Sequence, residues 1–423
     1  MITNLINKAK EHNISLEVCT YNEKEYYIET LNEELITSTI TKTKEYNVKA
    51  LYNGKVVTIS TEKIDNPDEI IKLIIDNANL TDNSNENRLC ENDFEVNDRK
   101  ETIINPNDIK NELFKLNKYF HEKYAFLVNV DAIVYHTDII RMIDNENHHM
   151  KDSYGFYNVY FIISGKKKDT VKSINSYTYG CKIDFDKFKE EVENDIKKLE
   201  LSFDATSIKT DKYKVLINNL SLNRIMSTVA NFFNAKPLDM KTSPLAGKLN
   251  EKVFSDKISL LIDPVNENFM VNKHFDNEGT LTRNIEIVKD GVFKTALNNL
   301  EYAIKNNTEP TGNANMICNY HLKPGEKFFD ELIKEMNNGI IINTVEGLHA
   351  GINNNTGEIS LQSTGFLVEN GEIIKPLDMI ILQTNIFELL SNVIEVGKDL
   401  REFDSSYSSP SILLDNITIS GNL

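Results

Sequence analysis

Apolar and polar residues alternate over several short stretches of the first half of the chain. Such alternation places every second side chain on the same face and predicts half-buried β-strands. The stretches are residues 15–19, 25–29, 35–43, 125–135, 139–143, 156–164 and 171–179. Asn53-Gly54 before a strand-like run at 56–59 adds a hairpin. The first half therefore contains antiparallel strands.

Apolar residues at helical spacing interrupt these strands. A short stripe at Leu5, Ile6 and Ala9 predicts a first helix, and Pro67 opens a second after a cap at Asp65 or Asn66. Residues 107–122 and 185–201 predict two more, the last with Phe188, Val192, Ile196 and Leu199 inward. The polar stretch 81–87 between these elements predicts a loop.

The pattern changes near residues 204–210, and we place a domain boundary there. Beyond it come a strand at 214–217, a helix over 220–234 capped by Ser221, and many short strands between glycine turns. Hairpins are predicted at 285–293 and 365–373, and a late helix at 386–396 ends at Gly397. The sequence thus predicts an α+β protein. Residues 1–205 form an N-terminal α/β domain, and residues 206–423 form a β-rich, sandwich-like or barrel-like domain.

Composition and charge limit the kinds of partner that the protein can bind. The chain has 423 residues and a formal net charge of −17, so a phosphate backbone or an anionic membrane repels it. We therefore expect no direct nucleic-acid or membrane partner. The apolar runs are far shorter than the roughly 20 residues of a membrane span. The first ten residues are too polar for a signal segment. The four scattered cysteines are expected to be reduced thiols, and the chain to be cytoplasmic.

One cluster of candidate chemistry follows residue 273. On an extended backbone His274, Asp276 and Glu278 share a face, where they could bind a divalent metal or do acid–base work. The competing interpretation is a polar strand end entering a turn, with Asp276 accepting hydrogen bonds from local amides, and we favour it.

Two other polar segments have a structural and a chemical interpretation. In 308–314, Pro310 and Gly312 predict a rigid turn, and Gly312 and Asn313 could cradle a ligand with backbone amides, although a structural connection is favoured. His148 and His149 follow a polar turn and are expected to be solvated rather than to bind metal. Phosphate-loop, serine-hydrolase and HExxH or HxxEH zinc signatures do not occur in the sequence.

The order and spacing of several turn motifs over about 210 residues resemble the TldD/PmbA family, the peptidase modulators of DNA gyrase. Each motif is weak alone, and residues 1–205 agree in organisation only. The motifs lie at residues 243–249, 275–280 with Thr282 and Arg283, 289–294, 311–314, 354–360, 368–376 and 409–411.

The resemblance implies an N-terminal α/β domain, a β-rich C-terminal domain and dimers. In the bacterial pair, TldD is a zinc metalloprotease with HExxxH on a helix and a C-terminal Cys ligand. TldE (PmbA) lacks these residues and supports TldD. Counting back from residues 243–248, the HExxxH window falls on 226–231, where Met226, Ser227 and Asn231 replace His, Glu and His. The Cys position lies near 403–408, yet the last cysteine is Cys318.

These replacements remove the zinc chemistry from this chain, because a thioether and an amide bind Zn²⁺ poorly and Ser227 is no general base. Our leading hypothesis is a metal-free TldE/PmbA-like subunit of a TldD/TldE-type metalloprotease that processes unfolded peptides. No catalytic or metal residue is expected here, and zinc would be held by an HExxxH-bearing partner, although a homodimer stays open. The alternatives are an autonomous hydrolase that uses His274, Asp276 and Glu278, and a non-enzymatic regulator of the gyrase-modulator type.

Overall fold

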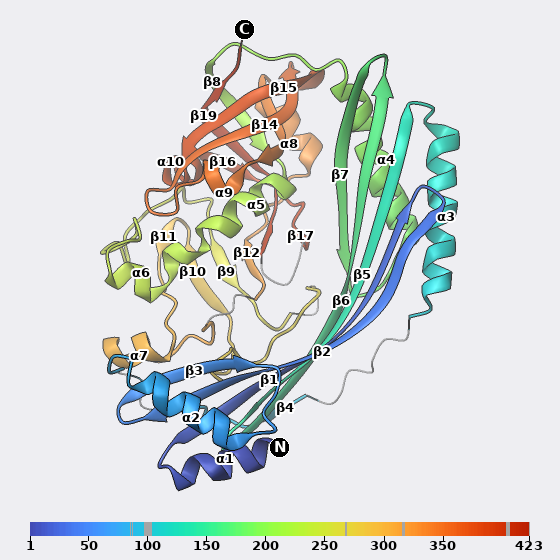
Figure 1. The fold of residues 1–423 in the computed structure, drawn as a ribbon. Helices are drawn as coiled ribbons and strands as arrows, with labels where there is room; N and C mark the ends of the chain where they lie inside the picture. The colour runs from blue at the N-terminus through green and yellow to red at the C-terminus, as the bar shows by residue number, and fades with distance from the viewer. Residues whose placement is uncertain are drawn as a thin grey trace.

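The fold is α+β, as predicted, with a long sheet in the first half and two β-rich sheets in the second (Figure 1). The computed structural model describes residues 1–84, 86, 88–96, 104–266, 269–314, 318–402 and 407–422. Up to residue 202 the elements are α1 (Ile2–Glu11), β1 (Ser15–Leu31), β2 (Glu34–Tyr52), β3 (Lys55–Thr61), α2 (Pro67–Ala78), β4 (Phe94–Glu95), α3 (Pro106–Lys123), β5 (Leu127–Asp144), β6 (His149–Lys167), β7 (Thr170–Gly180) and α4 (Phe185–Ser202).

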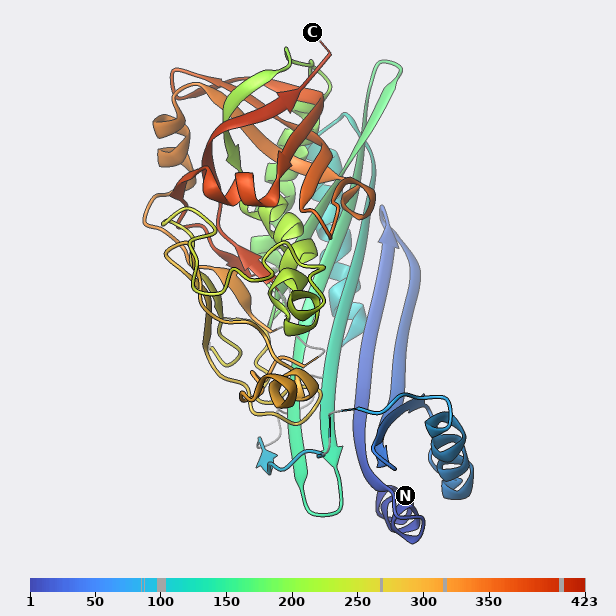
Figure 2. The same ribbon diagram turned by 90° about the vertical axis from the view of Figure 1, so that its left-hand side faces the viewer.

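The first sheet has the order β3-β2-β1-β5-β6, with β7 and β4 both paired to β6. Its strands are longer than predicted, because residues 15–31 form one strand and residues 127–144 another. The polar residues between the predicted short strands stay in the hydrogen-bonded ladder, since β1 is paired on both sides. Helices α3 and α4 cover one face of this sheet, and the other face turns toward the C-terminal half (Figures 1 and 2).

The C-terminal half contains a closed barrel and an open sheet. Strands β15-β14-β13-β8-β19 form a ring, because β15 also pairs with β19. The second sheet has the order β11-β10-β9-β12-β18-β17. The elements are β8 (Asp211–Ile217), α5 (Asn219–Val229), η1 (Ala230–Phe233), α6 (Ala235–Asp239), β9 (Leu260–Ile262), β10 (Ile285–Lys289), β11 (Val292–Phe293), α7 (Leu300–Asn306), β12 (Tyr320–Leu322), α8 (Phe329–Met336), β13 (Gly339–Glu346), α9 (Leu348–Gly351), β14 (Glu358–Glu369), β15 (Glu372–Asn385), α10 (Ile386–Ser391), β16 (Val393–Val396), β17 (Arg401–Glu402), β18 (Tyr407–Ser409) and β19 (Ile412–Ser420).

Local turn and cap signals predict some of these elements well and others wrongly. The three predicted hairpin turns have left-handed backbone at Asn53-Gly54, Asp290-Gly291 and Asn370-Gly371. The cap of α5 is Asn218, whose side chain accepts a hydrogen bond from the Ser221 amide, so the predicted Ser221 cap is wrong. The helix predicted over 386–396 is confirmed only for its first part, because α10 ends at Ser391 and residues 393–396 form β16.

The reason for that error is tertiary. Pairing with β19 places Val393 and Val396 in the C-terminal core, so the ladder outweighs the helical spacing of the apolar residues. The predicted helical window from 226 to 231 holds only in part, because α5 gives way to a 3-10 turn at Ala230.

Separate hydrophobic cores lie on the two sides of residue 205. Two clusters contain only residues up to 203, and the largest cluster contains only residues from 208 onward. A small cluster joins the halves where Phe275 packs with Cys19, Cys90, Ile143 and Met150. The division into domains at 205 stays a prediction. Among the described residues, no helix is both long and apolar enough to cross a membrane. None of the four cysteines, all of which lie in the described residues, forms a disulfide.

The packing of α3 on the first sheet gives a direct test of this architecture. Phe120 is fully buried between α3 and the sheet. Phe120→Ala should lower the free energy of unfolding by about 3–5 kcal/mol, because it leaves a cavity in a close-packed core. Chemical denaturation monitored by circular dichroism measures this loss. The exposed Lys118→Ala on the same helix should change stability by less than about 0.5 kcal/mol, and equal losses for both variants would contradict this packing.

Candidate functional site

The helix α5 carries the window that corresponds to HExxxH. Met226 is 1% exposed and packs in the main C-terminal core. The Ser227 hydroxyl donates to the Arg224 carbonyl. Asn231 is exposed on the 3-10 turn, where its Oδ1 accepts from the Asn234 side chain. The three side chains point in different directions and have local partners. Among the apolar residues around this window, Ile225, Phe232 and Phe233 are buried, while the Val229 side chain lies outside the described residues.

A pocket of about 350 Å³ lies between α5 and the first sheet. Tyr177 of β7, Arg224 of α5 and Gln362 of β14 are among its lining residues. Arg224 Nη1 donates to the Val345 carbonyl at 2.7 Å, which fixes α5 on β13. On the pocket wall Lys172 Nζ contacts Asp378 Oδ2 at 2.9 Å, which joins the two halves. Hydroxyl, amide and charged groups line this pocket, so it can satisfy the main chain of a bound peptide.

The segment His274–Thr280 forms a tight turn rather than an extended strand. Gly279 has φ +72°, and the Asp276 amide donates to the Thr280 carbonyl at 2.9 Å. Asp276 is 0% exposed, and its carboxylate accepts from the amides of Glu278, Thr280 and Ala314, each at 2.9 Å. Burial raises the pKa of Asp276 while these amides lower it, and burial prevails. These hydrogen bonds agree with the interpretation of Asp276 as an acceptor for local amides.

His274 and Glu278 point to partners that differ from those of Asp276. The His274 amide donates to Asp152 Oδ2 at 2.9 Å, its Nδ1 lies 3.3 Å from Asp152 Oδ1, and its ring stacks on Phe94. Glu278 Oε2 accepts from the Leu300 amide at 2.7 Å. The three predicted residues therefore do not converge on one point. In the described parts of the chain, no group of three or more His, Cys, Asp or Glu side chains is arranged to hold a metal ion.

Glu278 belongs instead to a charged pocket at the junction of the halves. This pocket has a volume of about 350 Å³ and is lined by Glu17, Lys49 and Glu86 together with Glu278. Lys49 pairs with the nearly buried Glu86. Burial raises the pKa of Glu278 to about 7, although the Lys49 charge and the Leu300 amide oppose the shift.

The turn at 311–314 is tied to the same junction. Gly312 has φ +77°, and a Cβ atom there would lie 2.6 Å from the Leu281 carbonyl oxygen, so only glycine fits. The Thr311 amide donates to the Asn298 carbonyl, and the Ala314 amide to Asp276. These two amides are thus used inside the chain, as a structural connection requires. Asn313 Oδ1 is buried with no hydrogen-bond partner in the described residues.

Arg141 of β5 was missed by the sequence reasoning, although it joins the two halves. It is 1% exposed, and its guanidinium donates to Asn277 Oδ1 at 3.0 Å and to the Phe275 carbonyl. Its Cζ lies 4.2 Å from the centre of the Phe275 ring, and Asp152 Oδ2 is 3.9 Å away. An arginine inside the apolar run 139–143 is a signal that could have found it, because a buried charge needs partners.

His148 and His149 lie apart from this junction. His148 Nδ1 contacts Asp93 and His149 Nδ1 contacts Asp144, at 3.2 and 2.7 Å. Each histidine thus has its own carboxylate partner at the start of β6. Residues Phe403–Ser406, in the segment expected to carry the cysteine ligand, lie outside the described residues.

Comparison with known families decides the relationship. The family model described as the PmbA/TldA metallopeptidase C-terminal domain matches residues 210–421. The chain belongs to the PmbA/TldD family. A metalloprotease PmbA homologue of Haemophilus influenzae is 29% identical over 302 residues, covering 70% of this chain and 66% of its own length. The metalloprotease PmbA of Escherichia coli O157:H7 is 30% identical over 181 residues, covering 43% and 40%. The chain thus spans less than two thirds of either relative.

Solved structures agree over the whole fold. A protein of Thermotoga maritima, described as a candidate modulator of a DNA gyrase, superimposes with a TM-score of 0.87 at 25% identity and 99% coverage of both chains. TldE of Thermococcus kodakarensis gives a TM-score of 0.85 at 20% identity, with coverage of 99% and 100%, and shows the fold alone. The PmbA/TldD resemblance inferred from the turn motifs is therefore confirmed, and it extends in fold to the first sheet.

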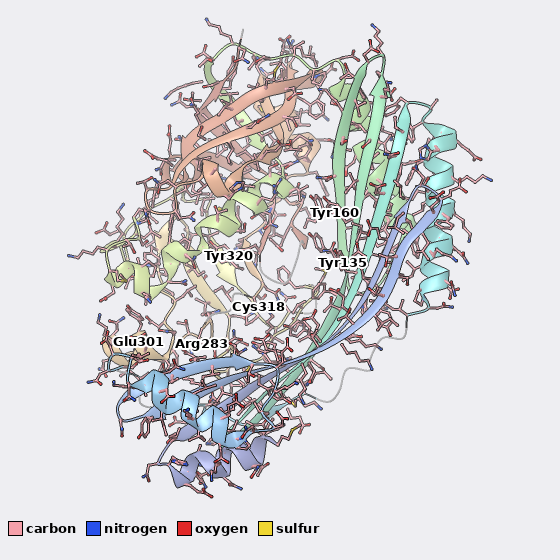
Figure 3. The ribbon with its side chains drawn as sticks, in the orientation of Figure 1. Tyr135, Tyr160, Arg283, Glu301, Cys318 and Tyr320 are labelled. Atoms are coloured by element: carbon pink, nitrogen blue, oxygen red, sulfur yellow. The ribbon has the colours of Figure 1, made fainter. Side chains whose placement is uncertain are left out.

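The buried arginine provides the first test of the junction. Arg141→Met should lower the free energy of unfolding by about 3–5 kcal/mol, because it leaves Asp152 buried beside His274 without its cation. Thermal and denaturant unfolding measure the loss. The exposed Arg283→Met, in the same family motif region (labelled in Figure 3), is the matched control and should change stability little. Similar losses of unfolding free energy in both variants would show that the contacts of Arg141 contribute nothing to stability.

The raised pKa of Glu278 predicts a pH dependence. Because its folded pKa, about 7, exceeds the ordinary value of 4.5, the folded state holds this proton longer. The contribution to stability is fully present below about pH 4.5 and is lost as pH rises through 7. Glu278→Gln should therefore be more stable than wild type at pH 8 by about 3 kcal/mol and lose this part of the pH dependence. Melting curves from pH 4 to 8 measure it, with the exposed Glu309→Gln as control. An unchanged slope for Glu278→Gln would contradict the shift.

Proposed function

We propose that this chain is a TldE/PmbA-like subunit, without a metal of its own, of a TldD/TldE-type metalloprotease complex that processes unfolded peptides. The observation that carries the proposal is the state of α5. The helix is kept, but its window contributes Met226 to the core, a Ser227 hydroxyl bound to its own helix, and an exposed Asn231. None of these groups can replace a zinc-binding histidine or a general base.

The active centre would then lie in a partner. A TldD-like subunit with HExxxH would bind Zn²⁺, which polarises the scissile carbonyl and activates water when bound. This chain would supply the dimer contact and one wall of the peptide cleft. The pocket beside α5 supports that role, because hydroxyl and amide groups of β7, β13 and β14 line it. An extended peptide needs such main-chain partners.

The autonomous hydrolase and the regulator receive less support. His274, Asp276 and Glu278 each have a separate structural partner, so they do not form a nucleophile–base–acid set. A regulator that contacts DNA directly would have to overcome the net charge of −17. Purification from the native cell distinguishes a homodimer without the zinc-bearing partner from the heteromeric complex.

Purification from the native cell tests the proposal. A tagged chain should recover an HExxxH-bearing relative, and the complex should contain zinc and cleave unfolded peptides. The chain purified alone should contain less than about 0.1 zinc per chain and show no peptidase activity, because it lacks a tetrahedral ligand set. Size-exclusion chromatography with zinc analysis measures both, and a complex whose partner lacks both HExxxH histidines is the control. Zinc at one ion per chain with peptidase activity in the isolated chain would overturn the proposal.

A further inference from the structure

The face of the first sheet opposite α3 and α4 carries a set of tyrosines. Directly paired residues of neighbouring antiparallel strands point to the same face. Tyr27 of β1 pairs with Tyr135 of β5, and their ring centres are 4.9 Å apart. Tyr160 of β6 pairs with Tyr177 of β7, with ring centres 4.7 Å apart. All four are half-buried, and Figure 3 shows Tyr135 and Tyr160 on the side turned toward the C-terminal half. We call this surface the tyrosine face.

Carboxylates share this face with the aromatic rings. Glu23, Glu25 and Glu29 alternate along β1 with the same two-residue period as Tyr27, so they project in the same direction. Glu29 accepts a hydrogen bond from the Tyr27 hydroxyl at 2.6 Å. Asp131 of β5 has a buried oxygen with no hydrogen-bond partner in the described residues.

Lys24 of β1 and Lys42 of β2 are on the other side of the sheet, whereas Lys49 of β2 pairs with Glu17 and lies on the side of the glutamates, near the 274–280 turn. Lys24 pairs with Lys42 across β1 and β2, one position out of phase with the glutamates, and its Nζ lies over the Tyr26 ring. No ion pair of 4 Å or less joins any of these four carboxylates to a described lysine, arginine or histidine. The four are Glu23, Glu25, Glu29 and Asp131. Cations border the face at its ends, because Lys273 Nζ lies 5.4 Å from the ring centre of Tyr154, which shares the side of Glu23, and the Arg224 charge acts on Tyr177. The part of the face around Tyr27 and Tyr135 is anionic.

Like charges lie close together on this face, which is electrostatically unfavourable. Burial, followed by the neighbouring Glu23 charge, raises the pKa of Glu25. Burial and the Glu29 charge raise the pKa of Asp131 in the same way. A cation placed between the carboxylates and the rings would relieve the repulsion and gain a cation–π contact. Carboxylates beside tyrosine rings are thus the complement of an ammonium or guanidinium group.

The spacing of the face points to a peptide rather than a small cation. Side chains on one face of a strand repeat every second residue, about 6.6 Å apart, and an extended peptide has the same repeat. Tyr177 also lines the pocket beside α5, so the tyrosine face continues into that pocket. A ligand that follows the strands can therefore place successive basic side chains over the face and its main chain near α5.

We propose that the tyrosine face binds extended peptides rich in lysine and arginine, which its glutamates and tyrosines select by charge and cation–π contact. The proposal rests on the proposed function in so far as these peptides are the cargo of the complex. It goes further by naming the class of peptide and the surface that recognises it. The occupant is a separate peptide, and a second copy of the chain on this face is one of the outcomes below.

The absence of tryptophan from this chain provides a clean assay. An unstructured peptide with one tryptophan and several lysines and arginines is titrated with the isolated chain. Its fluorescence anisotropy is followed under excitation that tyrosine does not absorb. A second peptide has glutamate in place of each basic residue. The basic peptide should bind, and the acidic one should bind at least about tenfold more weakly.

Matched variants separate the face from the overall charge. Glu23→Gln with Glu25→Gln should weaken binding of the basic peptide about tenfold. Glu369→Gln with Glu372→Gln, on the exposed β14–β15 turn, changes the net charge equally and should leave binding unchanged within about twofold. Tyr135→Leu should weaken binding and Tyr135→Phe should preserve it. Melting temperatures verify folding, and the Glu23/Glu25 variant should be no less stable than wild type.

Several results would overturn the inference. They are equal binding of the two peptides, equal weakening by the two double variants, or a stable dimer of the chain that the Glu23/Glu25 variant disrupts. The assay uses neither partner nor zinc, so its failure leaves the metalloprotease complex untouched. Conversely, selective binding by a chain that recovers no HExxxH partner would keep the peptide site and remove the proposed complex.

Discussion

The buried guanidinium of Arg141 is the interaction on which the two halves of the molecule depend. A desolvated charge is stable only where hydrogen bonds and an opposite charge compensate it. The groups that compensate Arg141 come from both halves of the chain. Asn277, the Phe275 carbonyl and the Phe275 ring come from the C-terminal half, and Asp152 from the next strand of the first sheet. The charge therefore fixes the 274–280 turn against β5 and β6. Asp276, three hydrogen-bonded amides and Gly312 then fix the loops behind that turn.

Because Arg141 anchors one end of the sheet to the C-terminal half, the part of the sheet with Tyr27 and Tyr135 is not needed for that contact. Where the 274–280 turn covers the sheet, Glu17, Cys19 and Arg141 are buried. Further along the same strands, the turn no longer covers the face, and Tyr27 and Tyr135 are only half-buried. One face of one sheet thus changes from fully buried to half-buried side chains. The length of β1 and β5, which the sequence patterns divided into shorter strands, makes this change possible.

The sequence predicted those features that short-range chemistry determines. Asn-Gly and Asp-Gly turns, Pro67 at the start of α2 and the buried stripe of α4 needed no information from outside their own segments. Prediction from the sequence failed where a partner strand or a distant residue determines the local structure. Residues 393–396 have helical spacing but pair with β19, and Asn218 takes the cap because Ser221 donates instead to Asn343. Of the candidate site, the turn role of Asp276 could be anticipated, whereas Arg141 acts through contacts up to 136 positions away in the chain.

The same distinction bears on α5. A catalytic helix needs side chains that point into a cleft. A structural helix needs only an apolar stripe and a cap. The cleft-facing positions of a helix differ from its core-facing and capping positions. Here Ile225 and Met226 are both buried, Asn218 caps the start, and Arg224 ties the helix to β13. Because these contacts come from the core, the cap and Arg224, they hold the helix in place without histidines in the 226–231 window. Under the proposed function, such a helix would form one wall of a peptide cleft while a partner chain would supply the zinc chemistry.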